Sequence, residues 1–95
     1  MSSIAYHEPV EERSAATRDL HRASVSLMEE VQAVDWCNQR AEAWADAELR
    51  AIIEHNRDEE KEHAAMLIEW IRRHDARLSQ ELKEYLFTEK LIADQ

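Results

Sequence analysis

The sequence predicts an all-α protein: an antiparallel two-helix hairpin followed by a short C-terminal helix. Its 95 residues include no glycine and one proline, Pro9. Tight β-hairpin turns, phosphate-binding loops and dinucleotide fingerprints need glycine where φ is positive or where the backbone approaches a ligand closely. A β-rich or nucleotide-binding fold is therefore disfavoured. Apolar residues instead recur at spacings of three and four, the period of an amphipathic helix.

The first long helix is expected from about Val10 to about Gln39, behind a flexible tail of residues 1–8. Pro9 suits the first helical turn, where its missing N–H is harmless. Residues 40–45 are the expected break between the helices. The apolar stripe of the first helix consists of Leu20, Ala23, Leu27, Val31 and Val34.

Asp46 is expected to cap a second helix that ends at about Arg73, a length of about 42 Å at 1.5 Å per residue. Asp75 is expected to cap the short third helix. Two long helices joined by a short connection form an antiparallel hairpin. The stripe of the second helix is Leu49, Ile52, Ile53, Asn56, Glu60, His63, Met66, Leu67, Trp70 and Ile71, and that of the third is Leu78, Leu82, Tyr85 and Leu86.

Charge and composition exclude several classes of partner. The chain has 12 Lys and Arg against 21 Asp and Glu, a formal net charge of −9. An acidic chain has no footprint for nucleic acid or an anionic membrane surface, and no apolar run approaches the roughly 20 residues that span a bilayer. A single cysteine and no visible signal peptide suit the reducing cytoplasm. Residues 9–95 form one helical domain with a thin core, so we expect self-association.

Two ionisable side chains interrupt the apolar stripe of the second helix. Glu60 and His63 are three positions apart in the sequence and therefore lie about 5–6 Å apart on one face. Glu30 falls on the edge of the apolar face of the first helix, between Leu27 and Val34. An unpaired buried carboxylate is costly, and two glutamates and a histidine avoid that cost by sharing a cation. The pattern predicts Glu30, Glu60 and His63 as metal ligands.

The Glu-x-x-His spacing, with a glutamate from a neighbouring helix, is half of a di-metal site in a four-helix bundle. The chain has one such motif, Glu60 to His63, so two copies related by a twofold axis would complete the site at their interface. Carboxylates with one imidazole per metal and no thiolate suit iron or manganese. Two alternatives stay open: a polar layer that fixes dimer register without metal, and a metal store without turnover.

A second polar cluster, His55, Glu59 and Glu62, follows one outward strip of the second helix. It is read either as a solvated acidic face or as a weak peripheral cation site. Trp36 lies near the end of the first helix, where it can border the predicted centre. Cys37 is expected to be a free thiol, and three histidines, His7, His21 and His74, are expected to lie on the surface without partners.

Four blocks of this sequence resemble the encapsulated ferritins, the iron-oxidising cargo proteins of bacterial and archaeal encapsulin nanocompartments. The resemblance covers roughly residues 8–89, and its longest block makes it more specific than the bare Glu-x-x-His spacing. The blocks are Met28–Glu30, Ala33–Trp36, His55–Met66 and Tyr85–Glu89.

The resemblance implies that subunits pair as a ferritin-like four-helix bundle with a ferroxidase centre at the dimer interface, and that dimers form a ring-shaped decamer. It implies iron as the metal, two ions per dimer, with Fe²⁺ and O₂ as substrates and the encapsulin shell as partner. The ligands of the family fall on Glu30, Glu60 and His63, and the tryptophan beside the centre falls on Trp36. The peripheral site of the family falls on His55, Glu59 and Glu62.

The chain departs from the pattern of the family at two positions. The site through which metal enters pairs two acids, which fall on Glu29 and position 32. Here Gln32 leaves that site one carboxylate, so we expect weaker binding of Ca²⁺ or other divalent cations there and at the peripheral site. A tyrosine often follows the tryptophan in the family, where this chain has Cys37. The residues up to Gln95 contain no counterpart of the shell-docking extension of the family, so shell targeting is not read from them.

Overall fold

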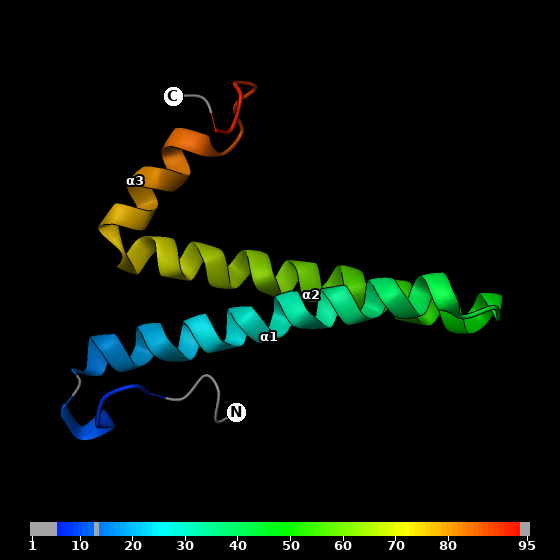
Figure 1. The fold of residues 1–95 in the computed structure, drawn as a ribbon, viewed down its shortest axis with the longest axis horizontal. Coiled ribbons are helices and arrows are strands. Elements are labelled where there is room, and N and C mark those ends of the chain that lie inside the picture. Colours follow the sequence, from blue (N-terminus) through cyan, green and yellow to red (C-terminus); the bar gives the residue numbers. More distant parts are fainter. Residues whose placement is uncertain (1–5, 13, 94–95) are drawn as a thin grey trace.

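The computed structural model describes residues 6–12 and 14–93, and in that part of the chain it is all α-helical apart from turns and one 3-10 turn. Helix α1 spans Ala15–Ala43, α2 spans Ala47–His74 and α3 spans Ala76–Tyr85, while the 3-10 turn η2 spans Val10–Glu12. Helices α1 and α2 lie side by side and antiparallel, and α3 turns away at the open end of the hairpin (Figure 1). The all-α hairpin prediction is confirmed.

Helix α1 begins five residues later than the sequence predicted. Pro9 precedes the separate turn η2, and Ser14 is the N-cap of α1, its Oγ accepting a hydrogen bond of 3.1 Å from the backbone N–H of Thr17. The first N–H groups of a helix have no partner within the helix, and a serine hydroxyl at the N-cap accepts from one of them. Helix α1 therefore begins after Ser14 and not at Pro9. Of the predicted tail, residues 1–5 lie outside the described residues.

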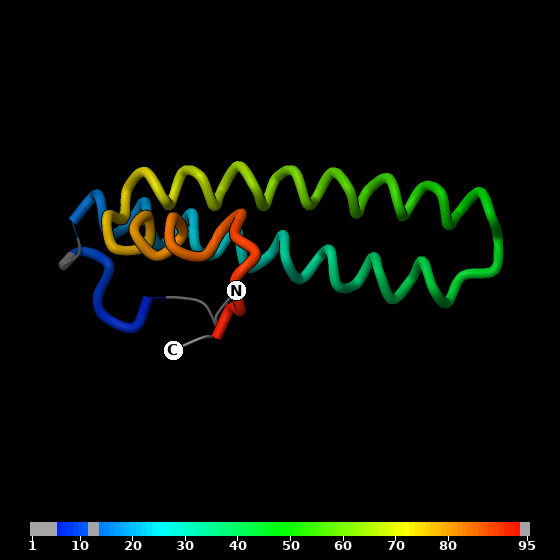
Figure 2. Tube along the Cα trace, turned by 90° about the horizontal axis from the view of Figure 1, so that it is seen from above, coloured from blue at the N-terminus to red at the C-terminus, as the bar shows by residue number. Residues whose placement is uncertain are grey.

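The predicted break at residues 40–45 begins four residues too early, because α1 continues to Ala43 and the turn occupies Trp44 to Asp46. The side chain of Arg50 reaches back from α2 and donates from Nε and Nη2 to the carbonyl oxygen of Trp44, at 3.3 and 2.9 Å. This bond satisfies a carbonyl at the end of α1. The predicted cap of α2 is confirmed, since Asp46 accepts from the N–H three residues later. Figure 2 shows this tight turn at one end of the hairpin.

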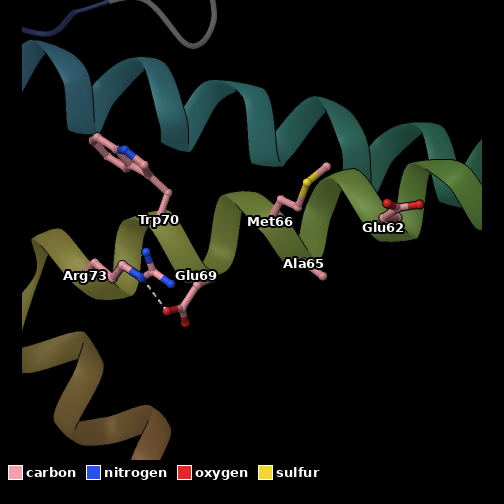
Figure 3. Close-up of a pocket in the computed structure, with 6 residues that line it drawn as sticks. All are labelled: Glu62, Ala65, Met66, Glu69, Trp70 and Arg73. Carbon is pink, nitrogen blue, oxygen red and sulfur yellow. Dashed lines mark hydrogen bonds and ion pairs between the residues drawn. The ribbon is translucent and has the colours of Figure 1, made fainter.

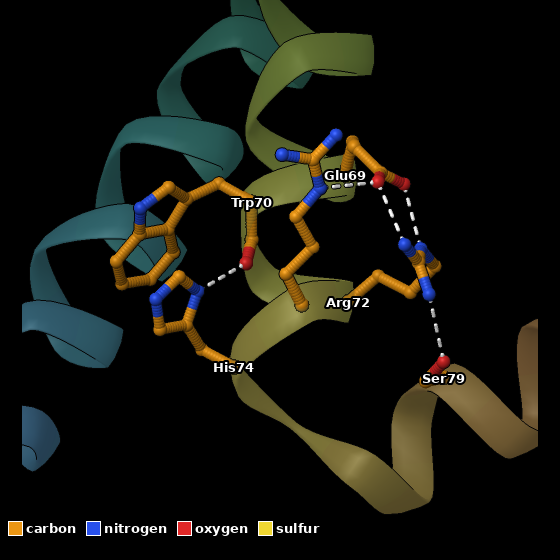
Figure 4. Close-up of polar contacts among 6 residues, drawn as sticks. Glu69, Trp70, Arg72, His74 and Ser79 are labelled. Atoms are coloured by element: carbon orange, nitrogen blue, oxygen red, sulfur yellow. Dashed lines mark hydrogen bonds and ion pairs between the residues drawn. The ribbon is translucent and has the colours of Figure 1, made fainter.

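Helix α3 is joined to α2 by polar contacts at the junction. Asp75 caps α3 as predicted, accepting from the backbone N–H of Leu78 at 3.0 Å. Arg72, in the last turn of α2, donates to both carboxylate oxygens of Glu69 and, from Nη1, to Ser79 Oγ on α3 at 3.0 Å (Figure 4). The junction is therefore an ion-paired corner.

The core of the isolated chain is thin. Its buried apolar residues, within the described part, are Ala23, Val25, Cys37, Ala41, Ile53 and Ile71. Cys37 is a free thiol, as expected, and it packs with Ala41 and Ile53. Much of the predicted stripe stays exposed, including Val31 at 56 % and Ile52 at 60 %. A wide apolar face of the hairpin is therefore left uncovered.

Two histidines that were expected to lack partners have them. The rings of His21 and Tyr6 lie 3.9 Å apart, and His74 stacks on Trp70 at the same separation. The Nδ1 atom of His74 also lies 2.7 Å from the carbonyl oxygen of Trp70, one turn earlier (Figure 4). None of the helices in residues 6–12 and 14–93 combines the length and the apolar character that a membrane span requires.

Candidate metal centre

The three predicted ligands come together in the middle of the hairpin. Glu30 projects from α1, and Glu60 and His63 project from adjacent turns of α2. His63 Nδ1 lies 3.5 Å from Glu30 Oε2 and 3.7 Å from Glu60 Oε2. Their ligand atoms all lie within 4.8 Å of one another, and in the described part of the chain no other group of three such side chains meets that limit. We call these three residues the triad.

The hairpin geometry explains why the triad forms. Glu30 and Glu60 are equally far along the chain from Ala45 in the turn, so the antiparallel helices place them opposite each other. His63 follows Glu60 on the same face of α2, because residues three apart on a helix are neighbours. The spacing along each helix and the position of the turn together fix the triad.

The electrostatics of Glu30 mark the triad as an unsatisfied site. Its Oε2 atom is enclosed from solvent and has no hydrogen-bond partner. The neighbouring carboxyl group of Glu60 is the main cause of a raised pKa at Glu30, burial adds to the rise, and His63 opposes it. Two carboxylates this close repel each other when both are ionised. A cation between them would remove both the repulsion and the unpaired acceptor.

The donor set fits a transition-metal ion. Ligand atoms that bind one ion at about 2.1 Å lie at most about 4.2 Å from one another. The 4.8 Å spread of the triad therefore closes with small side-chain rotations. Two carboxylates and one imidazole leave coordination positions open for further ligands or substrate. The side chain of His63 is 46 % exposed, so solvent reaches the triad in the single chain.

An apolar groove runs along α2 close to His63. Figure 3 shows Met66 and Trp70 rising toward α1, while Glu69 and Arg73 form an ion pair on the other side. Met66 is 57 % exposed despite its place in the predicted stripe. The groove is lined by Glu62, Ala65, Met66, Glu69, Trp70 and Arg73. The surface beside the triad is therefore apolar and uncovered in the single chain.

The structure brings together part of the predicted peripheral cluster. His55 Nε2 lies 2.8 Å from Glu59 Oε1, and both side chains are exposed. Glu62, the third member, lines the groove described above. Glu29 and Gln32 are exposed on α1. The peripheral site and the site of metal entrance stay predictions.

Trp36 is a half-exposed residue near the C-terminal end of α1. Its ring lies under the guanidinium of Arg40, with 6.0 Å between Arg40 Cζ and the ring centroid. Six residues of helix turn the chain by about 240° beyond one full rotation, so Trp36 does not share the α1 face of Glu30. Its predicted place beside the centre stays a prediction.

Sequence reasoning missed a polar contact between the two helices. Arg57 Nη1 on α2 donates to Asn38 Oδ1 on α1 at 3.3 Å. Its signal is visible in the sequence: Arg57 comes four residues after Ile53 and three before Glu60, so it interrupts the apolar stripe.

Residues 5–89 match the family model described as EncFtn-like. The chain belongs to the EncFtn-like family. It is 58% identical over 88 residues to the encapsulated ferritin-like protein of Rhodospirillum rubrum, a match that covers 93% of this chain and 63% of that protein. It is 52% identical over 89 residues to the ferritin-like protein of Thermotoga maritima, covering 94% of this chain and 78% of that protein.

A solved structure agrees with the EncFtn-like fold of this chain. The crystal structure of a Nitrosomonas europaea protein superposes with a TM-score of 0.92 at 62% identity, over 95% of this chain and 99% of that one. The resemblance to the encapsulated ferritins is confirmed, and the EncFtn-like family supports an iron-related, ferritin-like function. The chain spans less than two thirds of the Rhodospirillum rubrum relative.

Proposed function

We propose that this EncFtn-like protein is a ferroxidase, which oxidises Fe²⁺ to Fe³⁺ with O₂ at a di-iron centre shared by two copies of the chain. The carrying observation is the triad: Glu30, Glu60 and His63 supply one half of the donor set of a di-metal bundle site. Because the sequence contains no second Glu-x-x-His, the other half must come from another copy.

The uncovered apolar face supports pairing at the triad. Monomeric soluble proteins rarely expose large contiguous apolar patches unless these bind something. A twofold pairing of hairpins over the triad would bury this face and build a ferritin-like four-helix bundle. The exposed apolar residues of α1 and α2 that support this proposal include Met28, Val31, Leu49, Ile52 and Met66. The ring-shaped decamer stays a prediction from the family resemblance.

The proposed reaction takes iron as substrate. Two Fe²⁺ ions each give one electron to O₂, which takes up two protons and is reduced to H₂O₂, and both ions leave as Fe³⁺. Glu30 and Glu60 would hold the two ions, and their carboxylates can change binding mode as the metal charge rises. His63 would be the terminal ligand, since its Nδ1 is the atom that faces both carboxylates. Glu29 on the exposed surface of α1 would guide ions toward the centre.

The proposed place of action is an encapsulin nanocompartment in the cytoplasm, where the shell stores the mineral made from oxidised iron. The support is the name of the Rhodospirillum rubrum relative, an encapsulated ferritin-like protein. Purified shells from cells that make this chain should contain it by mass spectrometry. Its absence from the shells would contradict the proposed location and leave the reaction itself untouched.

Aerobic addition of Fe²⁺ tests the reaction directly. The protein should produce near-UV Fe³⁺ absorbance over many turnovers per centre. Glu60→Ala should reduce the rate to that of buffer, while Glu54→Ala, a carboxylate lost elsewhere on α2, should keep the original rate. Equal rates for Glu60→Ala and the unchanged protein would exclude the triad as the reaction centre.

One alternative keeps support from the same geometry. The distances of 3.5 and 3.7 Å from His63 to the two carboxylates also suit a metal-free ion-paired layer that fixes dimer register. That reading expects no Fe²⁺ oxidation and an unchanged dimer in metal-free buffer. A metal store without turnover would instead show a single oxidation event per site, or none.

A further inference from the structure

Most of the buried residues that α1 contributes are small, whereas those of α2 are Ile53 and Ile71. Three of the buried residues along the seam between the two helices are small, namely Ala23, Cys37 and Ala41. Small side chains form shallow ridges and grooves, which interdigitate less than large ones. The triad draws ligands from both helices, so any sliding changes the distance from Glu30 to His63.

A polar contact crosses the same seam away from the triad. Arg57 Nη1 on α2 donates to Asn38 Oδ1 on α1 at 3.3 Å. Apart from the triad, it is the one hydrogen bond between side chains of α1 and α2 in residues 6–12 and 14–93. The Arg57 side chain is only 23 % exposed, and its Nε also contacts Asp58 Oδ1 at 3.3 Å. The guanidinium is a rigid planar fork, so these two contacts fix its direction.

The position of this contact lets it act on the centre. Arg57 precedes Glu60 by three residues, which is about 4.5 Å along α2. Asn38 follows Glu30 by eight residues, which is about 12 Å along α1. Because both stretches are continuous helix, a contact that fixes Arg57 against Asn38 also fixes the two sides of the triad.

We propose that Arg57 and Asn38 are positioning residues, which set the register of α1 against α2 and so hold Glu30 within reach of a metal ion bound by Glu60 and His63. The inference rests on the proposed metal centre and adds to it two residues that do not touch the metal. It predicts that binding strength and ligand geometry change when the contact is lost.

Titration with Co²⁺ alone, followed by its visible absorption, tests the positioning role without iron oxidation. Arg57→Met and Asn38→Ala should each weaken Co²⁺ binding about 2- to 10-fold, the range expected for loss of one hydrogen bond. Each should also shift the Co²⁺ absorption band at saturation, because one ligand is displaced. The double variant should bind no more weakly than either single variant, since both changes remove the same interaction.

The neighbouring residue of Asn38 provides a matched control. Gln39 is also an amide on α1, but its Nε2 donates to Asp35 Oδ2 on the same helix, at 3.0 Å. Gln39→Ala should therefore leave both the Co²⁺ affinity and the absorption band unchanged. This control separates the effect of losing a side-chain amide on α1 from the effect of losing the contact between the helices.

A conservative variant tests the role in the opposite direction. Asn38→Asp keeps the acceptor oxygen and gives it a charge, and charge-assisted hydrogen bonds are roughly twice as strong as neutral ones. This variant should bind Co²⁺ at least as tightly as the original chain and keep the original band. Because it strengthens the contact, it gives a result even where Arg57→Met fails to fold.

The outcomes separate the inference from the proposed function. An original chain that binds no Co²⁺ would overturn both. The positioning role alone would be overturned if the original chain bound Co²⁺ and the Arg57→Met and Asn38→Ala variants showed the same affinity and the same absorption band. The positioning role would also be overturned if Arg57→Met lowered the thermal midpoint but left the Co²⁺ absorption band at saturation unchanged. The contact would then stabilise the fold without placing the metal ligands.

Discussion

At the scale of single residues, Glu30 shows a conflict between folding and binding. Its Oε2 atom is enclosed without a hydrogen-bond partner, beside the carboxylate of Glu60. An unpaired acceptor next to a like charge destabilises the metal-free fold. The same arrangement favours a cation. Stability is commonly sacrificed at sites of this kind.

Glu30→Gln should therefore change stability and binding in opposite directions. The raised pKa of Glu30 means that its ionised form is disfavoured in the fold. A neutral amide of the same shape should raise the thermal midpoint of the metal-free protein. Co²⁺ affinity should fall at least about 10-fold, since even residues that only support metal ligands cost 10- to 100-fold when changed. Calorimetry in chelator and Co²⁺ titration measure the two effects.

An exposed carboxylate on the same helix serves as control. Glu42→Gln should move neither the midpoint nor the affinity appreciably. A lower midpoint for metal-free Glu30→Gln would contradict the view that Glu30 is held unfavourably in the fold.

At the scale of elements, the corner between α2 and α3 depends on Glu69. This carboxylate receives hydrogen bonds from Arg72 at 2.6 and 2.7 Å and from Arg73 at 2.6 Å. These bonds, Arg72 first, lower the pKa of Glu69 from 4.5 to about 2. Arg72 in turn donates to Ser79 on α3, so protonating Glu69 would loosen the corner.

The lowered pKa of Glu69 predicts a pH effect of defined sign. A carboxyl group whose folded pKa is depressed contributes stability above its unfolded pKa, and that contribution is lost as the pH falls through the folded value. The free energy of unfolding should fall as the pH is lowered from 4.5 to about 2, and it should fall less steeply in Glu69→Gln than in the original chain. Urea unfolding at several pH values measures it, with Glu42→Gln as reference. Parallel curves for the two variants would show that Glu69 contributes nothing to acid stability.

The end of α3 carries backbone strain. Phe87, one residue beyond the helix cap, has φ of 58°, in the left-handed region that glycine normally occupies at this position. The chain contains no glycine to take that place. A residue with a Cβ atom pays about 1–2 kcal/mol there. The Phe87 side chain is fully exposed, so its contacts within the chain do not offset the strain.

Phe87→Gly should stabilise the last turn of α3 by about 1 kcal/mol. Amide hydrogen exchange of α3, measured in chelator, should slow by several-fold. Phe87→Ala removes the same ring but keeps the Cβ atom, so it should show no such slowing. Equal exchange in the two variants would mean that the backbone at this position is not strained.

At the scale of the whole molecule, assembly should depend on metal. A site completed by two chains binds the dimer and not the free subunit, so bound metal stabilises the dimer by mass action. Native mass spectrometry should show larger species with Fe²⁺ under anaerobic conditions and smaller species after chelation. His63→Ala should weaken this shift.

His55→Ala provides the matched comparison, because it removes an exposed histidine of the same helix that pairs with Glu59 outside the triad. It should keep the metal-dependent shift. Identical distributions with and without Fe²⁺ in the unchanged protein would argue against a centre between subunits.

The sequence by itself determined the helical class, the caps of α2 and α3, and the faces that carry the triad. These features depend on residues that are close in the sequence. The helical period repeats within a few residues, and Asp46 and Asp75 each accept a hydrogen bond from the backbone N–H three residues later. The spacing from Glu60 to His63 likewise needs only one helix. The start of α1 was predicted too early, beside Pro9. The helix begins after Ser14, because the Ser14 side chain caps it.

Only the tertiary structure decided what depends on how the two helices face each other. It places Glu30 across the seam from His63, encloses one of its oxygens and brings Arg57 to Asn38. It also buries Cys37 and leaves Ile52 and Met66 exposed, although all three lie in helices of clear period. The physical reason is that periodicity gives the face of a residue within its helix, whereas burial and cross-helix distance depend on the turn and on the register of the packed helices.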